Sequence, residues 1–394
     1  MTQPLIHILG GGLWQLPTIR KAKALGYRVL VSDMYPNPPG FALADLHEQV
    51  DITDREATLK VAERHQIDGI ICDTTDVGVP TMAYVAEKLG LPGIGLETAL
   101  NFTNKYRMRD LTSKAGLANP PFRKATTLAK ARGFGFPLPF VVKPVDSQSS
   151  RGVHVIRNSD EIDYSILDAL KNSRSGEIIV EGFLDGIEVT VESVVVAGRV
   201  HTVGISDKDH YAHRPEVANR LTYPAAFPVA ILQSITNLNA AVVAALGLKN
   251  GVTHAEYMVV GETPYLVEIA ARGAGSYVYS DIGPYLAGVD IPSAYLQYAV
   301  GGDFTATPDE ISRAANLAFF DFPAGKVKGI YGVEAAKTLP GVHTILLEFS
   351  PGDFIQPPND DRSRIGLVVV FGNTRDQVLA TTRQVMETVK VTYA

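Results

Sequence analysis

The chain has 394 residues, of which 46% are hydrophobic and 20% charged; this composition excludes a collagen-like, coiled-coil or disordered protein. The formal net charge of −6 is spread along the chain, which argues against a dedicated nucleic-acid-binding protein because those usually carry a basic stripe. No apolar run reaches the roughly 18–20 residues that span a bilayer, so we expect no membrane partner.

The N-terminal sequence and the cysteine count both favour a cytoplasmic protein. The first seven residues lack the basic start and cleavage site of a signal peptide. The single cysteine, Cys72, cannot form an internal disulfide. We therefore expect a cytoplasmic location.

Predicted strands and helices alternate in the first part of the chain. Apolar runs predict strands at 5–9, 29–31 and 69–72, and helical patterns cover 14–25, 54–65 and 77–89. This alternation is typical of a parallel sheet in an α/β domain. Pro120 and Pro121 punctuate the chain, so we expect the first domain to end near residue 119.

Short strands at hairpin spacing follow. They are predicted at 140–143, 153–157, 178–180, 187–196 and 200–206, then at 253–260 and 265–269 after a helix at 231–246. This spacing indicates an antiparallel sheet. From about residue 325 the chain mixes strands with a final helix at 376–388.

A glycine run after the first strand is the first candidate binding motif. Gly10, Gly11 and Gly12 stand between a strand and a helix, and Asp33 follows the second strand. Backbone N–H groups at a helix start bind anions, and an acid after the second strand can hold a ribose. Gln15 stands where a dinucleotide fingerprint needs its third glycine, so a simple tight turn is the better interpretation.

Two later segments have features suited to binding a nucleotide. Lys143 ends a strand and precedes the small, polar loop 146–153, which can lay backbone N–H groups over phosphate oxygens. Glu181 and Glu188 flank a short turn between apolar strands; such a turn offers backbone groups to an adenine edge, and a carboxylate can accept ribose hydroxyls. The alternatives without a binding role are an exposed hairpin with a surface lysine for the first segment and a hairpin with two solvated acids for the second.

A predicted hairpin carries two acids and an arginine. Glu256 and Glu268 lie on its successive strands; if they face each other, they need a counter-cation, and Mg²⁺ prefers such oxygen ligands. Arg272, just beyond, could neutralise charge on a transferred phosphoryl group. His254 has no other histidine or cysteine at metal-ligand spacing, so we expect a structural or substrate-facing role. The alternative is that the two acids point apart into solvent.

Taken in order, these segments resemble the ATP-grasp superfamily, and within it the carboxylate–amine ligases, including L-amino-acid (dipeptide) ligases and glycinamide ribonucleotide-type synthetases. The resemblance covers nearly the whole chain and includes segments 73–76, 104–109, 351–353 and 363–366. It implies an α/β (α+β) fold in four parts: a Rossmann-like parallel-sheet domain (1–119), a lid (120–206), a core with the metal site (207–324) and a small C-terminal α+β part (325–394).

The resemblance also implies roles for individual residues. Arg272 and Lys143 would be catalytic, and Glu256 and Glu268 would bind Mg²⁺ or Mn²⁺. The residues that would bind ATP are Lys105, Lys143, Ser147, Ser149, Ser150, Gly152, Glu181, Phe183, Leu184 and Glu188. The residues that would face the substrate are His254, Arg272, Gly273, Ser276 and His210, the last within the polar segment 207–214, which could instead be a solvated loop.

Two departures from the family pattern concern the metal site and the phosphate loop. Ala270 stands where many members have an asparagine two residues after the second metal-binding Glu. The loop lacks an extra glycine near Ser149. The first departure leaves open whether the protein has one or two metal sites. The second bears on how the loop closes over the γ-phosphate.

The implied activity is ATP-dependent ligation, in which a carboxylate, most simply that of an amino acid, becomes an acyl phosphate and an amine then attacks it. Small-molecule substrates and a homodimer are implied. Three alternatives stay open: a ligase of nucleotide or cofactor biosynthesis, a nucleotide-binding regulator, and an NAD-dependent oxidoreductase that uses Gly10–Gly12 and Asp33.

Overall fold

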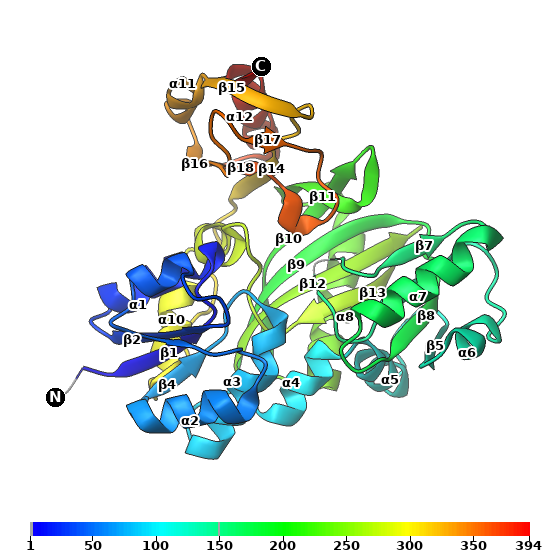
Figure 1. Ribbon diagram of the computed structural model, residues 1–394, viewed down its shortest axis with the longest axis horizontal. Helices are drawn as coiled ribbons and strands as arrows, with labels where there is room; N and C mark the ends of the chain where they lie inside the picture. Colours follow the sequence, from blue (N-terminus) through cyan, green and yellow to red (C-terminus); the bar gives the residue numbers. More distant parts are fainter. Residues whose placement is uncertain (1–2, 149) are drawn as a thin grey trace.

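The computed structural model describes residues 3–148 and 150–394, and the strands within these ranges form four sheets (Figure 1). The N-terminal sheet has the order β3-β2-β1-β4 with all pairs parallel. Its strands are β1 (Leu5–Leu9), β2 (Arg28–Asp33), β3 (Leu46–Gln49) and β4 (Gly69–Ile71). The helices between and after them are α1 (Leu16–Ala24), α2 (Arg55–His65) and α3 (Val79–Leu89). The predicted parallel α/β arrangement is confirmed.

A small antiparallel sheet follows, in the order β5-β8-β6-β7. Its strands are β5 (Phe122–Ala125), β6 (Phe140–Pro144), β7 (His154–Ile156) and β8 (Ile178–Gly182). Helices α6 (Leu128–Arg132) and α7 (Ile162–Asn172) accompany them. Residues from α6, α7 and these strands bury one apolar cluster, so this part has a small core of its own.

The large sheet has eight strands in the order β13-β12-β9-β10-β11-β14-β18-β16, and its pairs are antiparallel. The strands are β9 (Ile187–Val196), β10 (Arg199–Tyr211), β11 (Arg214–Tyr223), β12 (Gly251–Val260), β13 (Thr263–Ala270), β14 (Ala314–Phe319), β16 (Val342–Leu347) and β18 (Gly366–Gly372). The sheet therefore runs from the centre of the molecule into the C-terminal lobe (Figure 1).

The remaining elements join the parts or complete the C-terminal lobe. Helices α4 (Leu96–Thr103) and α5 (Lys105–Lys114) precede the small sheet, and α9 (Gly283–Ala287) and α10 (Ile291–Ala299) follow β13. The C-terminal lobe adds a three-stranded sheet of β15 (Gly325–Tyr331), β17 (Phe354–Ile355) and β19 (Lys390–Tyr393), with α11 (Val333–Lys337) and α12 (Arg375–Thr388).

Helix α8 (Val229–Leu246) is, among the described residues, the one helix long and apolar enough to cross a membrane by length and composition. Its buried asparagine has partners on the large sheet. Asn239 is fully buried, donates to Ser193 Oγ at 2.9 Å and accepts from the Tyr257 hydroxyl at 2.9 Å. Because Ser193 and Tyr257 lie on β9 and β12, α8 is anchored to the large sheet as a core helix.

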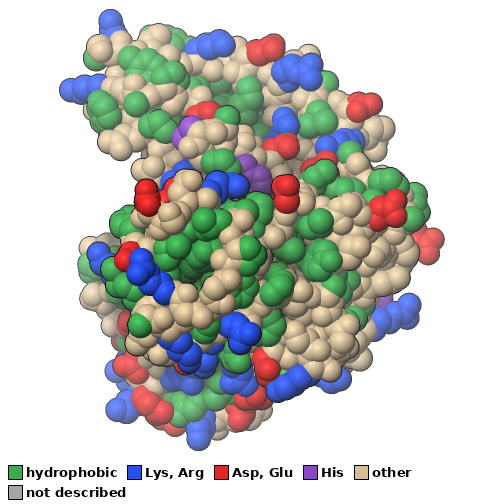
Figure 2. Space-filling view, turned by 90° about the vertical axis from the view of Figure 1, so that its right-hand side faces the viewer, with side chains coloured by type: hydrophobic (Ala, Val, Ile, Leu, Met, Phe, Trp, Pro, Cys, Tyr) green, Lys and Arg blue, Asp and Glu red, His purple; other side chains and the backbone are tan. Residues whose placement is uncertain are grey.

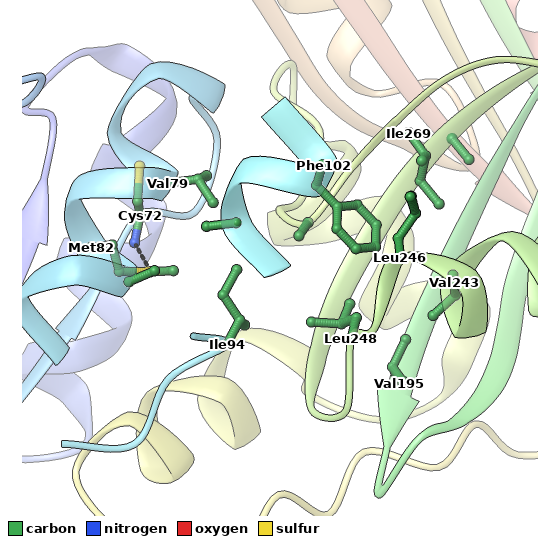
Figure 3. Packing of buried hydrophobic residues seen from close by; sticks show 14 of the residues in the cluster. Cys72, Val79, Met82, Ile94, Phe102, Val195, Val243, Leu246, Leu248 and Ile269 are labelled. Carbon is green, nitrogen blue, oxygen red and sulfur yellow. Dashed lines mark hydrogen bonds between the residues drawn. The ribbon is translucent and has the colours of Figure 1, made fainter. Parts of the chain in front are cut away.

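The largest apolar cluster joins the N-terminal domain to the large sheet (Figure 3). Met82 of α3 and Phe102 of α4 belong to it, as do Leu246 of α8 and Ile269 of β13. The Cys72 backbone N–H donates to Met82 Sδ at 3.1 Å. This shared core fixes the turn after β4 relative to the strands of the large sheet.

The sheet topology bears on the proposed division of the chain. The small sheet ends at Gly182, whereas β9, which begins at Ile187, and β10, which begins at Arg199, hydrogen-bond within the large sheet. We therefore propose moving the boundary between lid and core from residue 206 to about residue 186. The other predicted boundaries stay as proposals.

Candidate active site

A cavity of about 910 Å³ lies between the small sheet and the large sheet. Its walls come from the turn after β4, from β6 and β8, from β12 and β13, and from the C-terminal segment 361–364. In the space-filling view the surface narrows to a waist below the C-terminal lobe, and charged and histidine side chains gather there (Figure 2). All four parts of the chain thus contribute to one site.

Glu181, on β8, is the centre of a buried ion cluster in the small sheet. Its Oε2 accepts from Lys143 Nζ at 2.7 Å, and its Oε1 accepts from Arg109 Nε at 2.6 Å. Burial opposes ionisation of Glu181, but the charges of Arg109 and Lys143 outweigh it and lower its pKa to about 2. Glu181 therefore stays a carboxylate and holds the Lys143 ammonium in the cavity wall.

Lys105 links the loop 146–153, which the sequence predicts to bind phosphates, to the large sheet. It is the first residue of α5, whose N-cap Asn104 accepts from the Arg107 backbone N–H at 3.0 Å. The Lys105 ammonium donates to the backbone oxygen of Ser147 at 2.7 Å and to Glu268 Oε1 at 2.7 Å. One lysine thus connects the loop with one of the two predicted metal ligands.

The strand register pairs Glu256 on β12 directly with Glu268 on β13. Two like charges at paired positions repel each other without a neighbouring cation. A lysine ammonium contacts each of them: Lys105 on Glu268, and Lys208 on Glu256 at 2.6 Å. The two acids therefore do not point apart into solvent.

Lys208 and His210, on β10, contact the carboxylate that the sequence predicts to hold the ribose. Lys208 Nζ lies 2.8 Å from Glu188 Oε1, and His210 Nε2 lies 2.8 Å from Glu188 Oε2. Burial opposes ionisation of Glu188, but Lys208 and His210 outweigh it and lower its pKa to about 2. Because Lys208 also contacts Glu256, it bridges the predicted ribose and metal carboxylates.

His254 forms a buried pair with Glu192. Its Nδ1 lies 2.7 Å from Glu192 Oε1, and that oxygen also accepts from the Tyr223 hydroxyl at 3.1 Å. Burial disfavours the imidazolium, but the negative charge of Glu192 outweighs this and raises the pKa of His254. Its Nε2 is 4.0 Å from Glu256 Oε1, so the ring sits beside the carboxylate pair.

Arg272 follows β13 and is held by the N-terminal domain. Its Nε and Nη2 donate to the two oxygens of Asp76 at 2.8 and 2.7 Å. Asp76 opens the 3₁₀ turn Asp76–Gly78 directly after β4. The N-terminal domain therefore supplies the partner of the arginine predicted to be catalytic.

The phosphate loop is held at several points among its described residues. Gln148 Oε1 accepts from the Asp76 backbone N–H at 2.8 Å, and Ser150 Oγ lies 3.5 Å from Asp361 Oδ2. Gly152 has φ +69°, and a Cβ there would lie 2.8 Å from Asn172 Cβ, so this position requires glycine. Ser149 lies outside the described residues.

Glu256 and Glu268 fit a hard divalent cation by their chemistry. Both present carboxylate oxygens, the ligands that Mg²⁺ prefers, from neighbouring strands. Within residues 3–148 and 150–394, no group of three or more histidine, cysteine or acidic side chains is arranged to hold a metal ion. Mg²⁺ usually completes its shell with water and substrate phosphates, so two protein carboxylates match a nucleotide-bound ion.

Comparison with known proteins places the chain in a family. Residues 136–281 match the ATP-grasp domain, and residues 318–394 match the L-amino acid ligase C-terminal domain 2. The formate-dependent phosphoribosylglycinamide formyltransferase of Stutzerimonas stutzeri (strain A1501) is 30% identical over 278 residues, which are 68% of each chain. The chain belongs to the ATP-grasp superfamily. ATP-grasp enzymes use ATP with Mg²⁺.

The similarity of this ATP-grasp protein to other curated relatives covers a smaller part of their length. The corresponding formyltransferase of Synechococcus sp. (strain CC9902) is 33% identical over 196 residues, 48% of this chain and 50% of that one. The chain thus spans about half the length of several curated relatives that it matches.

Solved structures confirm the ATP-grasp fold. The L-amino acid ligase from Bacillus licheniformis superposes with a TM-score of 0.85 at 24% identity, over 100% of both chains. The biotin carboxylase domain of the Hydrogenobacter thermophilus 2-oxoglutarate carboxylase, solved with MgADP, has a TM-score of 0.78 at 16% identity, over 100% of this chain and 91% of that one.

The ATP-grasp cavity gathers most of the predicted site residues. Those that line it are Lys105, Lys143, Ser147, Ser150, Glu181, Phe183, Leu184, Glu188, His210, His254, Glu256, Glu268, Arg272 and Ser276. Gly152 and Gly273 do not line the cavity, although their neighbours in sequence do. Ser276 has φ +54° and is buried, so this turn adopts a left-handed conformation without glycine.

The structure adds four site residues that the sequence analysis did not single out: Asp76, Arg109, Glu192 and Lys208. Each contacts a predicted site residue from a distant part of the chain. Lys208 lies in the polar segment 207–214; its first part, 207–211, belongs to β10 and is not a solvated loop. Alternation along β10, which puts Lys208 and His210 on one face, was the available signal.

The glycine run of the N-terminal domain serves the fold. Asp33 Oδ2 accepts from the Gly11 backbone N–H at 2.8 Å, and Oδ1 accepts from the Tyr35 N–H at 3.0 Å. A Cβ on Gly11 would lie 2.9 Å from Pro38 Cγ, so Pro38 covers the turn. Asp33 is therefore engaged by backbone groups, which does not favour the dinucleotide-binding alternative.

Proposed function

We propose that this protein is an ATP-dependent carboxylate–amine ligase, with an amino acid as its carboxylate substrate. The observation that carries the proposal is the pairing of Glu256 with Glu268 in one cavity with Lys105, Lys143 and Arg272. This set suits a metal–nucleotide complex and an acidic reaction partner. The match of residues 318–394 to an L-amino acid ligase domain supports this substrate class.

The nucleotide would lie against the small sheet. Lys105, Lys143 and the loop residues Ser147, Ser150 and Gly152, together with Ser149, would contact the phosphates. Phe183 and Leu184 would line the adenine pocket beside Glu181, and Glu188 would accept the ribose hydroxyls. Glu256 and Glu268 would hold Mg²⁺ or Mn²⁺, which when bound neutralises phosphate charge.

The chemistry has two steps. A carboxylate oxygen of the substrate attacks the γ-phosphorus, the bond to the bridging oxygen breaks, and ADP leaves. The amine nitrogen then attacks the carbonyl carbon of the acyl phosphate, inorganic phosphate leaves, and the nitrogen loses a proton. Arg272 would stabilise the developing negative charge, and the protein mainly positions the partners and excludes water.

Hydroxylamine trapping tests the proposal, because hydroxylamine converts an acyl phosphate into a hydroxamate. Purified protein with Mg²⁺ and ATP is incubated with pools of amino acids and other small carboxylates, and ADP and hydroxamate are measured. We expect hydroxamate with at least one amino-acid pool and none for Glu268→Ala. Wild-type turnover in Glu268→Ala would contradict the metal site.

A second candidate is a ligase of nucleotide or cofactor biosynthesis. It is favoured by the 30–33% identity to phosphoribosylglycinamide formyltransferases. ADP release that requires a phosphorylated amine together with formate or bicarbonate, with no hydroxamate from any amino-acid pool, would support it. ATP binding without ADP from any mixture would instead indicate a nucleotide-binding regulator. For either ligase we propose small-molecule substrates, a homodimer and a cytoplasmic location.

A further inference from the structure

Arg272 has two N–H groups left for a ligand. A guanidinium carries five N–H donors in a planar fork. Asp76 accepts from Nε and from one Nη2 hydrogen, and the Gly273 carbonyl accepts from one Nη1 hydrogen at 3.0 Å. No other hydrogen bond of Arg272 occurs among the described residues. Two hydrogens remain, one on each Nη, and they suit the oxygens of one anion.

The carboxylate that produces this arrangement lies on a rigid turn. Asp76 and Arg272 are both mostly buried, with side chains 15% and 16% exposed. The strand before Asp76 is wholly buried, and Cys72 Sγ donates to the Thr75 carbonyl at 3.1 Å. The turn therefore has little freedom to move, so its position determines the orientation of the Arg272 guanidinium.

The same turn also receives the phosphate loop. Gln148 accepts from the Asp76 N–H at 2.8 Å, and its Nε2 donates to Thr75 Oγ1 at 3.2 Å. Asp76 thus touches Arg272 through its side chain and the loop through its backbone. In the proposed function, Arg272 and this loop act on the same phosphoryl group. Both are held by the turn at Asp76.

We propose that Asp76 is a positioning residue: it presents the two remaining Nη–H groups of Arg272 to the reacting anion and, with Gln148, couples this placement to the position of the loop 144–153. The inference rests on the proposed function. The other carboxylates whose charges act on Arg272 are those of Glu268 and Glu192. Without Asp76, the arginine is free to turn toward them and away from the substrate.

The decisive variant is Asp76→Asn, which keeps the shape but replaces one acceptor oxygen by a donor and removes the charge. We expect the kcat of carboxylate-dependent ADP release to fall at least 30-fold, while the Kd for ATP stays within threefold. Asp309→Asn is the matched control, because Asp309 also holds an arginine with both oxygens, at 2.7 and 2.8 Å, but does not line the cavity. We expect less than a twofold change for it.

A double variant tests whether Asp76 acts through the arginine. Arg272→Lys cannot form the two-point contact. If Asp76 works by orienting Arg272, Asp76→Asn combined with Arg272→Lys has a kcat within threefold of Arg272→Lys alone. If the kcat of the double variant instead falls by the product of the two single-variant factors, Asp76 acts independently of Arg272 and the proposal is overturned. If Asp76→Asn does not fold, Asp76→Glu takes its place, with an expected tenfold loss of kcat and unchanged ATP binding.

Amide hydrogen exchange tests the placement without any substrate. We expect Asp76→Asn to exchange faster in 270–277, and Gln148→Ala to exchange faster in 144–153, with neither change in Asp309→Asn. If the wild type releases no ADP with any carboxylate, the proposed function fails, while exchange still decides the positioning role. Unchanged exchange in Asp76→Asn, or a wild-type kcat, would overturn the role of Asp76.

Discussion

Lys208 shows how a single side chain can neutralise two carboxylates at once. Its ammonium contacts Glu188 and Glu256, and its side chain is only 13% exposed. Breaking a buried pair by removing one partner leaves an uncompensated charge, which typically costs about 3–5 kcal/mol. We therefore treat Lys208 as part of the electrostatic framework of the site.

The variant Lys208→Met should lose about 2–4 kcal/mol of unfolding free energy in EDTA, because two carboxylates lose their cation. Added Mg²⁺ and ATP should restore part of this loss, since a cation at Glu256 replaces the missing charge. Urea denaturation with and without Mg²⁺ and ATP measures both effects. In the control Lys124→Met, whose pair with Glu177 is 34% and 28% exposed, we expect a loss below about 1 kcal/mol. Equal losses would contradict the bridging role.

Asp73, at the end of β4, is a buried acid with a perturbed pKa. Its side chain is fully buried, accepts from the Thr18 hydroxyl and has a second oxygen with no partner among the described residues. Burial outweighs these hydrogen bonds and raises its pKa from 3.8 to about 6. The folded protein therefore favours protonated Asp73.

This raised pKa predicts a pH dependence of stability. The contribution of Asp73 to the free energy of unfolding is fully present below about pH 4. It is lost as the pH rises to about 6, because in that window Asp73 ionises in the unfolded chain while the folded protein keeps it protonated. A shift of this size corresponds to about 3 kcal/mol. The difference in unfolding free energy between Asp73→Asn and wild type should thus grow in favour of the variant from pH 4 to pH 6 and then stay constant. A difference independent of pH would show that Asp73 titrates normally.

Sequence predicted the charged residues of one hairpin but not their partners. The hairpin pattern placed Glu256 and Glu268 on successive strands but left open whether they face each other, and the register pairs them directly. Asp76 lies 196 positions from Arg272, and Arg109 lies 72 from Glu181. No periodicity connects positions so far apart, because only the packed fold brings them together.

Among the elements, the turn after β13 depends on a glycine for close packing. A Cβ on Gly273 would overlap the ring of Tyr279 in the π-helix Val278–Ile282. Tyr279 is itself buried in the second apolar cluster. The ring therefore packs directly on the backbone that follows Arg272.

Gly273→Ala should displace this turn, because neither the Tyr279 ring nor the backbone has space to move. We expect a loss of about 1–3 kcal/mol in unfolding free energy from overpacking, together with reduced turnover through movement of Arg272. Thermal denaturation and ADP release measure the two effects. Gly133→Ala, where a Cβ meets its nearest atoms at 3.4–3.5 Å, should change stability by less than about 0.5 kcal/mol. A stable and fully active Gly273→Ala would contradict the packing argument.

Element types were predictable where patterns were long. Residues 54–65 carried a capping aspartate and a helical pattern, and α2 begins after Asp54, whose side chain accepts from the Ala57 N–H at 3.0 Å. The strand predicted at 200–206 was too short. β10 continues to Tyr211, because its polar residues Lys208 and His210 face a charged cavity and not solvent.

At the scale of the whole molecule, one sheet links the central part to the C-terminal lobe. β11 pairs with β14, with Arg220 opposite Ala318 and Tyr223 opposite Ala315, and β14 pairs with β18. The connection from α10 to β14, residues 301–313, has no regular structure and exposes Ile311. The lobe is therefore held by hydrogen-bonded strands more than by its connection.

Limited proteolysis tests whether the C-terminal lobe stays bound after its connection is cut. Proteinase K is expected to cut within 301–313 first, since exposed irregular segments are preferred sites. The two fragments should still elute together in size-exclusion chromatography, because the strand pairs and the apolar cluster of the lobe remain. Release of a free C-terminal fragment under native conditions would contradict the continuous sheet.

The resemblance implied a chain in four parts, but it did not indicate that one sheet continues from the central part into the C-terminal lobe. Alternation of strands and helices is enough for the parallel domain, and hairpin spacing is enough for antiparallel strands. The pairing of β11 with β14 joins segments about 95 residues apart, with α8, the β12–β13 hairpin, the π-helix Val278–Ile282 and two further α-helices between them. Such non-local pairing follows from the complete fold and not from local patterns.

The continuous sheet limits how this chain could recombine with its relatives. The matched C-terminal family begins at residue 318, which lies inside β14 (Ala314–Phe319). A chimera joined at residue 318 would take the two halves of one strand from different parents, and their registers against β11 and β18 would have to agree. A junction within 301–313 would transfer β14 whole. The segment that can be exchanged as one folded piece therefore begins before residue 318, where the family match starts.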